Sequence, residues 1–396
     1  MAALLVAAFA VVTLLFLWSL NVIVALGSFY VASAEEIAAG PPGSIIRKEP
    51  LSFGLLVDAD AWRVLYRSTG LHGEGIAVSG MVIVPRGLPP AGGRPIVGWA
   101  HPTSGVVPRC APSLALLRFQ QIQGLRALIE GGAIVAATDY PGLGTPGPHP
   151  YLIGRSEAYA VLDSLRAARS IAGSGASQDV ALWGHSQGGQ AVLHAGAAMA
   201  AYAPELRLAG VAAAAPATDL KVLVDEDIAS TGGKNLLAMT LWSWQRVFGA
   251  PLNEVVMRDA DDTVERLAAD CLETPLDIRR RLKLGRLLER AFLKVPDVTN
   301  LDPWRTLLTE NAAPLLPPAM PVFVAQGLDD TLVRPAVTRS YVDLLCGAGS
   351  PVRYVGVPGT GHGLIGRESA PAATAWIADR LAGRPPPDDC AARPDG

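Results

Sequence analysis

The residue of this chain best suited to covalent chemistry is a serine in a glycine-rich turn. Ser186 lies in the pentapeptide Gly184-His185-Ser186-Gln187-Gly188, which follows the apolar run 180–183 and precedes a helical stretch of small residues. A G-x-S-x-G turn between a strand and a helix predicts a nucleophile elbow, a strained and crowded turn that exposes the serine hydroxyl at a helix N-terminus. The alternative, a tight glycine turn without a chemical role, is the weaker interpretation in this context.

A serine hydroxyl needs a base to remove its proton, so the elbow predicts a histidine late in the chain and an acid between the two. His362 lies in a glycine-rich loop after the last expected strand, whereas the other histidines precede the elbow, lie within it or follow it in the helix. The acid is expected after the strand that ends at Gln326, where Asp329 and Asp330 are adjacent. We favour Asp330, whose carboxylate can turn back towards His362, while Asp329 is expected to face solvent or cap the following helix.

An acyl-transfer reaction at such a serine also needs backbone N–H groups that bind the oxyanion of the tetrahedral intermediate. One donor is expected from Gln187, the residue after the serine, and the other from the loop at residues 101–105. Thr103 or Ser104 can supply this second N–H, whereas Pro102 has none. The sequence therefore predicts an oxyanion hole formed by Gln187 and one of these two residues.

The elements that must position these residues alternate between short apolar runs and helical stretches. Strands are expected at 62–68, 75–85, 95–100, 133–137, 208–215, 321–326 and 352–357, and helices at 114–129 and 157–171. The first two strands are expected to pair antiparallel, and the later alternation predicts βαβ units. Ser156 is the expected N-cap of the helix at 157–171. The fold class is therefore α/β, and the chain order serine, acid, histidine is that of an α/β-hydrolase with a mostly parallel central sheet flanked by helices.

The strand pattern stops for about a hundred residues between Asp219 and Pro318, where tryptophan- and leucine-bearing helical segments replace it. We expect an inserted helical lid there. The predicted organisation is a signal peptide or membrane anchor at 1–34, a linker at 35–50, a core at 51–218 and 319–384 interrupted by the lid at 219–318, and a tail at 385–396. One large core is simpler than two domains for a chain of 396 residues.

The first 34 residues contain no Asp, Glu, Lys, Arg or His and are apolar over more than a membrane thickness. We expect this segment to enter a bilayer and the remainder of the chain to be exported. Ala32-Ser33-Ala34 is typical of a signal-peptidase site, but the segment is longer than an ordinary signal sequence and has no basic N-terminal region. Cleavage after Ala34 and retention as an anchor are both left open.

Charge and cysteine content exclude several function classes. The net charge is −3 with dispersed Lys and Arg, so no basic surface for nucleic acid is expected. The four cysteines are even in number and include no C-x-x-C pair, which favours disulfides over a metal or redox site, and no metal or cofactor is expected. Three connectivities are possible; proximity favours Cys346 with Cys390, which leaves Cys110 with Cys271, and four buried thiols are the alternative.

With these residues in place, the chain resembles the secretory lipase family of α/β-hydrolases, the lipase A type of fungi and bacteria. The resemblance rests on the segments 100–105, 110–113, 138–144, 154–157 and 184–189, and spans about residues 55–382. It implies a triad of Ser186, Asp330 and His362, an oxyanion hole of Ser104 and Gln187, and a helical lid over an acyl pocket. It also implies a disulfide near Cys110.

We therefore expect an exported serine carboxylic-ester hydrolase that acts on lipid-like acyl esters through a seryl acyl-enzyme. The first alternative is a cell-envelope acyltransferase that uses the same triad but passes the acyl group to an alcohol. The second is a catalytically silent, membrane-tethered binding protein with a hydrolase fold. The intact serine, aspartate and histidine argue against the silent protein.

Overall fold

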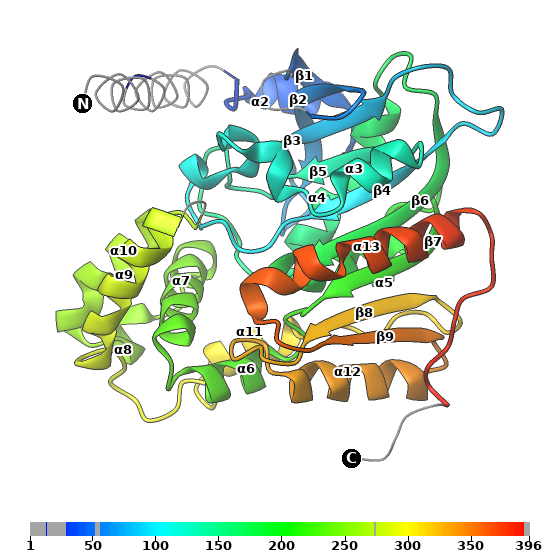
Figure 1. Ribbon diagram of the computed structural model, residues 1–396. Coiled ribbons are helices and arrows are strands. Elements are labelled where there is room, and N and C mark those ends of the chain that lie inside the picture. The colour runs from blue at the N-terminus through cyan, green and yellow to red at the C-terminus, as the bar shows by residue number, and fades with distance from the viewer. Residues whose placement is uncertain (1–12, 14–28, 52–55, 273–274, 392–396) are drawn as a thin grey trace, which may run out of the picture.

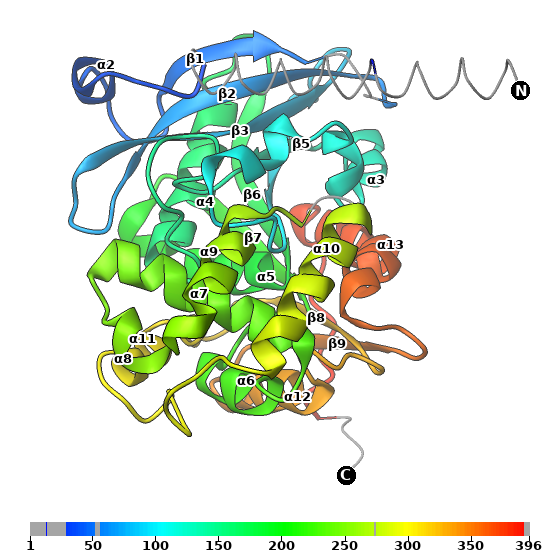
Figure 2. The same ribbon diagram turned by 90° about the vertical axis from the view of Figure 1, so that its left-hand side faces the viewer.

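The computed structural model describes residue 13 and residues 29–51, 56–272 and 275–391. The apolar segment expected to enter a bilayer lies mostly outside these residues, since 1–12 and 14–28 are not among them. Within the described ranges, no helix combines the length and apolar character that a bilayer crossing requires. Figures 1 and 2 show a twisted sheet with helices on both faces and a group of helices, α6 to α10, gathered at one end of it.

The described residues form a nine-stranded sheet in the order β1-β2-β3-β5-β4-β6-β7-β8-β9. The strands are β1 (Ile45–Pro50), β2 (Ala59–Thr69), β3 (Gly75–Pro85), β4 (Arg94–Ala100), β5 (Ile134–Thr138), β6 (Ala176–His185), β7 (Arg207–Ala214), β8 (Val322–Gly327) and β9 (Val352–Val357). β1, β2, β3 and β5 pair antiparallel in succession, and the remaining pairs, from β5–β4 to β8–β9, are parallel. Every strand expected from the sequence is present, and the α/β-hydrolase fold is confirmed.

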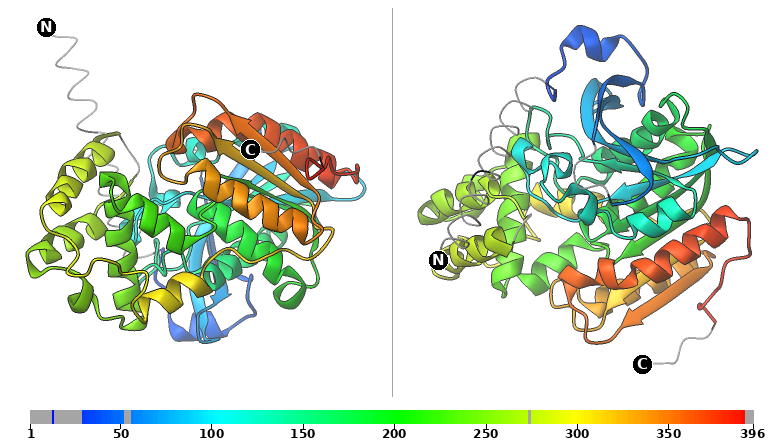
Figure 3. Two further views of the ribbon diagram at one scale, coloured as in Figure 1. Left: turned by 90° about the horizontal axis from the view of Figure 1, so that it is seen from below. Right: turned by 45° about the horizontal axis from the view of Figure 1, so that its top comes forward.

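Helices cover both faces of this sheet. α4 (Gly154–Arg169), α5 (Gln187–Tyr202) and α12 (Pro335–Gly347) share one apolar core with the sheet, and α3 (Leu125–Glu130) and α13 (His362–Leu381) share the other. Figure 3 shows α13 and α12 from two further directions, on either side of β8 and β9. The central strands are therefore buried on both sides, as their apolar runs require.

Between β7 and β8 lies the insertion, residues 219–318, whose apolar side chains form a hydrophobic cluster together with Val106, Tyr151, Ile153 and Ala217 of the core. It contains α6 (Leu220–Asp227), α7 (Thr231–Phe248), α8 (Leu252–Val255), α9 (Asp261–Ala269), α10 (Pro275–Gly285) and α11 (Trp304–Glu310). Trp242 and Trp244 are buried within that cluster. These tryptophans thus pack the insertion together and join it to the core, where the Trp244 Nε1–H donates to the Tyr151 carbonyl oxygen at 2.8 Å.

The structure corrects the expected linker at residues 35–50. These residues include most of the short helix α2 (Ala34–Ala38), which Ser33 caps, and strand β1. β1 forms because the outer edge of β2 offers unpaired backbone groups, and the Arg47–Glu36 ion pair at 2.5 Å ties α2 to the new edge strand.

The fold also begins before residue 35. Phe29 and Tyr30 are buried in the main core, and the Tyr30 hydroxyl lies 2.6 Å from Ser113 Oγ. The Arg63 guanidinium sits over both rings at 5.6 and 5.5 Å from their centroids. Residues 29–34, which the sequence assigned to the apolar N-terminal segment, are therefore part of the packed domain.

Two helix predictions were wrong in detail. The stretch 114–129 contains 3-10 turns and only the short helix α3, because Gly124 has a left-handed φ of 81° that breaks the helix. Helix α4 begins at Gly154, so Ser156 is not its N-cap. The Gly154 N–H is bound instead by the Asn311 side chain at 3.0 Å, a partner 157 residues away in the sequence.

Both favoured cysteine pairings are confirmed. Cys110 is bonded to Cys271, which joins the loop after β4 to the insertion, and Cys346 is bonded to Cys390, which fastens the C-terminal tail to α12. Disulfides of this kind are typical of proteins outside the cytoplasm.

Candidate active site

The nucleophile candidate lies in a strained turn between β6 and α5. Ser186 has φ 58° and ψ −118°, outside the regions that an L-residue normally occupies. The turn is tight enough that a Cβ on Gly184 would lie 2.1 Å from the Gly188 carbonyl oxygen, and a Cβ on Gly188 would lie 1.9 Å from that of Ala100. Both glycines are therefore required, and the loop after β4 is packed directly against the elbow.

Three loops at the carboxyl ends of parallel strands bring the predicted triad together. His362 Nε2 lies 2.8 Å from Ser186 Oγ, and His362 Nδ1 lies 2.7 Å from Asp330 Oδ2. Ser186 follows β6, Asp330 follows β8 and His362 begins α13 after β9. Parallel strands end at the same edge of the sheet, which is why residues far apart in the sequence meet there. The arrangement is suited to proton transfer from the hydroxyl to the imidazole.

The Asp330 carboxylate is fixed by its own loop. Its Oδ1 accepts hydrogen bonds from the Leu332 and Val333 N–H groups, each at 2.9 Å, and Gln326 Nε2 lies 3.3 Å from Oδ2. Asp330 is 3% exposed, whereas Asp329 is exposed. Of the two adjacent carboxylates, the structure brings only Asp330 to His362.

His185 supports the histidine loop from within the elbow. Its Nε2–H donates to the His362 carbonyl oxygen at 3.0 Å, and its Nδ1 accepts from Gln123 Nε2 at 3.2 Å. Burial and the neighbouring His362 lower the pKa of His185 to about 3, so it is neutral and keeps one donor and one acceptor. His185 thereby positions the backbone that carries the base.

The oxyanion-hole candidates are Gln187, within the elbow, and Ser104 or Thr103, in the loop after β4. Gln187 is the first residue of α5, where backbone N–H groups have no partner within the helix. The loop that bears Ser104 packs on Gly188, and the Ser104 Oγ is buried without a hydrogen-bond partner among the described residues. Thr103, the other candidate, has its hydroxyl 2.8 Å from the Tyr151 hydroxyl. Of the two hydroxyls in this loop, only that of Ser104 has no hydrogen-bond partner among the described residues.

A buried polar network holds the Gln187 side chain. Its Nε2 donates to Glu157 Oε1 at 2.7 Å and to His149 Nε2 at 2.8 Å. Burial raises the pKa of Glu157 to about 8 and lowers the pKa of His149 to about 3, so both groups are mainly uncharged near neutral pH. Sequence reasoning set His149 aside because it precedes the elbow, and gave Glu157 no role beyond its helix.

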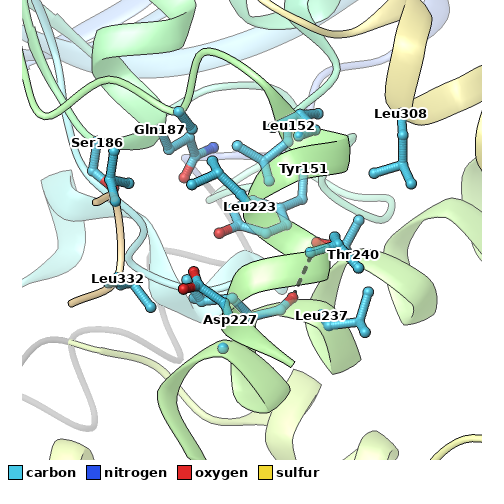
Figure 4. Close-up of a pocket in the computed structure, with 16 residues that line it drawn as sticks. Tyr151, Leu152, Ser186, Gln187, Leu223, Asp227, Leu237, Thr240, Leu308 and Leu332 are labelled. Atoms are coloured by element: carbon cyan, nitrogen blue, oxygen red, sulfur yellow. Dashed lines mark hydrogen bonds between the residues drawn. The ribbon is translucent and has the colours of Figure 1, made fainter. Parts of the chain in front are cut away.

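The serine opens into a cavity of about 60 Å³ between the core and the insertion (Figure 4). Most of its wall consists of aliphatic side chains, and α6 and α7 supply half of the lining residues. The lining comprises Tyr151, Leu152, Ser186, Gln187, Ala217, Leu220, Leu223, Val224, Asp227, Gly233, Leu236, Leu237, Thr240, Leu308, Leu332 and Val333. The cavity is suited to an apolar group attached to the atom that Ser186 attacks. No cluster of three or more His, Cys, Asp or Glu within the described ranges is arranged to hold a metal ion.

The sheet order, the elbow and the hydrogen-bonded serine, histidine and aspartate define an α/β-hydrolase. The chain belongs to the secretory lipase family, whose sequence profile matches residues 118–389.

Related proteins agree with this assignment. The chain is 27% identical over 366 residues to a probable inactive lipase of Mycobacterium tuberculosis, covering 87% of this chain and 79% of that protein. It is 24% identical over 372 residues to lipase A of Arthroderma benhamiae, covering 86% and 74%.

Solved structures share the fold. Candida antarctica lipase A superposes with a TM-score of 0.76 at 18% identity, covering 91% of this chain and 87% of that one. A rice cell wall degrading esterase, LipA from Xanthomonas oryzae, gives a TM-score of 0.69 at 19% identity, covering 87% and 99%.

Proposed function

We propose that the protein is an exported serine carboxylic-ester hydrolase that cleaves lipid-like acyl esters through a seryl acyl-enzyme. The observation that carries the proposal is the chain of hydrogen bonds from Ser186 through His362 to Asp330 at the mouth of an apolar cavity. Family membership supports ester hydrolysis, and the aliphatic lining supports an acyl group as the bound part of the substrate.

In the proposed mechanism, His362 Nε2 takes the proton of Ser186 Oγ while the oxygen attacks the ester carbonyl. Asp330 accepts the Nδ1–H hydrogen bond, which selects the tautomer with a free Nε2 and stabilises the imidazolium that forms. The backbone N–H groups of Gln187 and Ser104 bind the oxyanion. His362 returns the proton to the leaving alcohol, and water then cleaves the acyl-enzyme by the same steps.

We propose that the insertion is a lid. α6 and α7 supply half of the cavity lining beside the serine, and a cavity of about 60 Å³ leaves little room for a long acyl chain in this arrangement. Outward displacement of these helices is the simplest way to admit such a substrate.

We also propose that the apolar N-terminal segment is not removed after Ala34. Cleavage there would detach Phe29 and Tyr30, whose rings are buried in the core. Export is supported by the disulfides and by membership of a secretory family. The segment then acts as an anchor, or is cut upstream of Phe29.

The test is hydrolysis of p-nitrophenyl esters of increasing acyl length by the full chain. Ser186→Ala should abolish turnover, while Ser340→Ala, which changes an exposed serine on α12, should leave it unchanged. The acyl length that gives the highest turnover reports the size of the space that holds the acyl group. If Ser186→Ala turned over the esters as fast as the wild type, the proposed mechanism through Ser186 would be refuted.

The same assay distinguishes two alternative functions from ester hydrolysis. An acyltransferase would transfer the acyl group to an added alcohol faster than to water, which product analysis with and without the alcohol shows. A silent binding protein is favoured by the name of the mycobacterial relative, a probable inactive lipase, and would give no turnover from folded wild-type protein.

A further inference from the structure

The cavity beside Ser186 contains a carboxylate that the triad does not use. Asp227, the last residue of α6, is 7% exposed, and its Oδ1 is buried without a hydrogen-bond partner among the described residues. Figure 4 shows its carboxylate among the aliphatic side chains of the lining, which include Leu223 and Leu332. A buried polar group without a partner costs stability and therefore calls for an explanation.

The fold does not explain this carboxylate. Burial, with a smaller contribution from the like charges of Asp330 and Glu226, raises the pKa of Asp227 to about 7 against the opposing charge of Arg334. Arg334 makes its ion pair with Glu226, at 3.4 Å. The position is unfavourable as well, because the C-terminal end of a helix disfavours a negative charge. A leucine would complete the apolar wall at lower cost.

We propose that Asp227 binds a hydroxyl group of the ester substrate and so gives the enzyme a preference for hydroxyl-bearing esters. The proposal rests on the ester hydrolysis proposed above. A substrate hydroxyl in the cavity donates to the Asp227 carboxylate, and the aliphatic wall holds the rest of the substrate. An ammonium group fits less well, because the Arg334 guanidinium is close enough to repel it, and because protonation of Asp227 removes the attraction but leaves a carbonyl oxygen that still accepts from a hydroxyl.

The experiment compares matched esters by pH-stat titration with the full chain at pH 8. Ethyl 3-hydroxybutanoate against ethyl butanoate tests a hydroxyl on the acyl side, and glyceryl monobutyrate against propyl butanoate tests one on the alcohol side. Asp227→Leu and the isosteric Asp227→Asn are measured beside the wild type. The control is Asp225→Asn on the same helix, an exposed residue bonded to Thr299 outside the cavity.

We expect the wild type to favour the hydroxylated member of at least one pair in kcat/KM. Asp227→Leu should lower that ratio by about 10- to 100-fold, the usual effect of a hydrogen bond to a charged group, while Asp225→Asn should not change it. Asp227→Asn keeps an acceptor, so its ratio should fall between those of the wild type and Asp227→Leu. This variant still tests the proposal if Asp227→Leu does not fold.

An unchanged ratio in a folded Asp227→Leu protein that still hydrolyses ethyl butanoate would overturn the role of Asp227 and leave the proposed function intact. Failure of wild-type protein to hydrolyse any of the four esters in a Ser186-dependent manner would instead count against the proposed function, on which this inference depends.

Discussion

Replacing Tyr30 by alanine in the full chain should strongly destabilise the catalytic domain. An aromatic side chain buries about 150–250 Å², worth roughly 4–6 kcal/mol at about 25 cal/mol per Å². Compactness of the unfolded chain lowers this figure to about 3–5 kcal/mol, which matches the usual cost of aromatic-to-alanine changes in a core. Tyr30 is fully buried, so this range applies without a discount for exposure.

Two companion variants separate packing from hydrogen bonding. Tyr30→Phe removes only the hydroxyl that lies 2.6 Å from Ser113 Oγ and should cost about 1 kcal/mol. Val31→Ala changes the next residue, which is 46% exposed, and should stay within about 0.5 kcal/mol of wild type. A chain that begins at Glu35 loses both Phe29 and Tyr30, a large part of the roughly 5–15 kcal/mol that stabilises a domain.

The assay is urea denaturation followed by tryptophan fluorescence, with ester hydrolysis recorded on the same samples. Mass spectrometry of the exported protein gives its first residue. If Tyr30→Ala lost no more stability than Val31→Ala, or if the exported protein began at Glu35 with undiminished stability, the reasoning from Tyr30 burial would be refuted.

Three further predictions concern the active site and its surroundings. Asp330→Asn should lower kcat by about 10⁴-fold with little change in melting temperature, because it gives His362 the wrong tautomer; a loss below tenfold would exclude Asp330 as the triad acid. Asp227→Asn should be more stable than wild type by about 2 kcal/mol above pH 7 and equal to it below pH 4, since the raised pKa of Asp227, about 7, makes its contribution to folding fall as the pH rises between its unfolded and folded pKa values. Thermal melts from pH 4 to 8 measure the difference, and a constant offset would contradict it. Cys271→Ser should reduce kcat at least about tenfold, since its disulfide holds the loop of Ser104, whereas Cys346→Ser should affect melting but not kcat of the folded protein.

The sheet and the positions of the triad candidates follow from local sequence patterns. Apolar runs mark the strands, and a functional loop follows the carboxyl end of each parallel strand, so Ser186, Asp330 and His362 could be placed by order alone. Asp330 was favoured over Asp329 because its carboxylate can turn back towards His362, and the structure brings Asp330 to that histidine.

What the sequence missed depends on contacts between distant residues. Asn311 caps α4 from 157 positions away, so the local signal at Ser156 was misleading. Tyr30 looked like part of a membrane segment because only the folded domain supplies Ser113 and Arg63 as its partners. Asp227 carries no local signal, since an aspartate near a helix end is ordinary until the surrounding wall is known.

The Cys110–Cys271 disulfide gives the insertion a third covalent attachment to the core. The chain attaches the insertion at residues 219 and 318, and the disulfide fastens it again at Cys271, where the Leu272 N–H also donates to the Ser104 carbonyl oxygen at 2.7 Å. α6 and α7 lie between the first two of these attachments along the chain, residue 219 and Cys271. In the proposed outward movement of these helices, the displaced segment stays bonded to the loop that carries Ser104, so the proposal couples substrate entry to the position of the proposed oxyanion-binding loop.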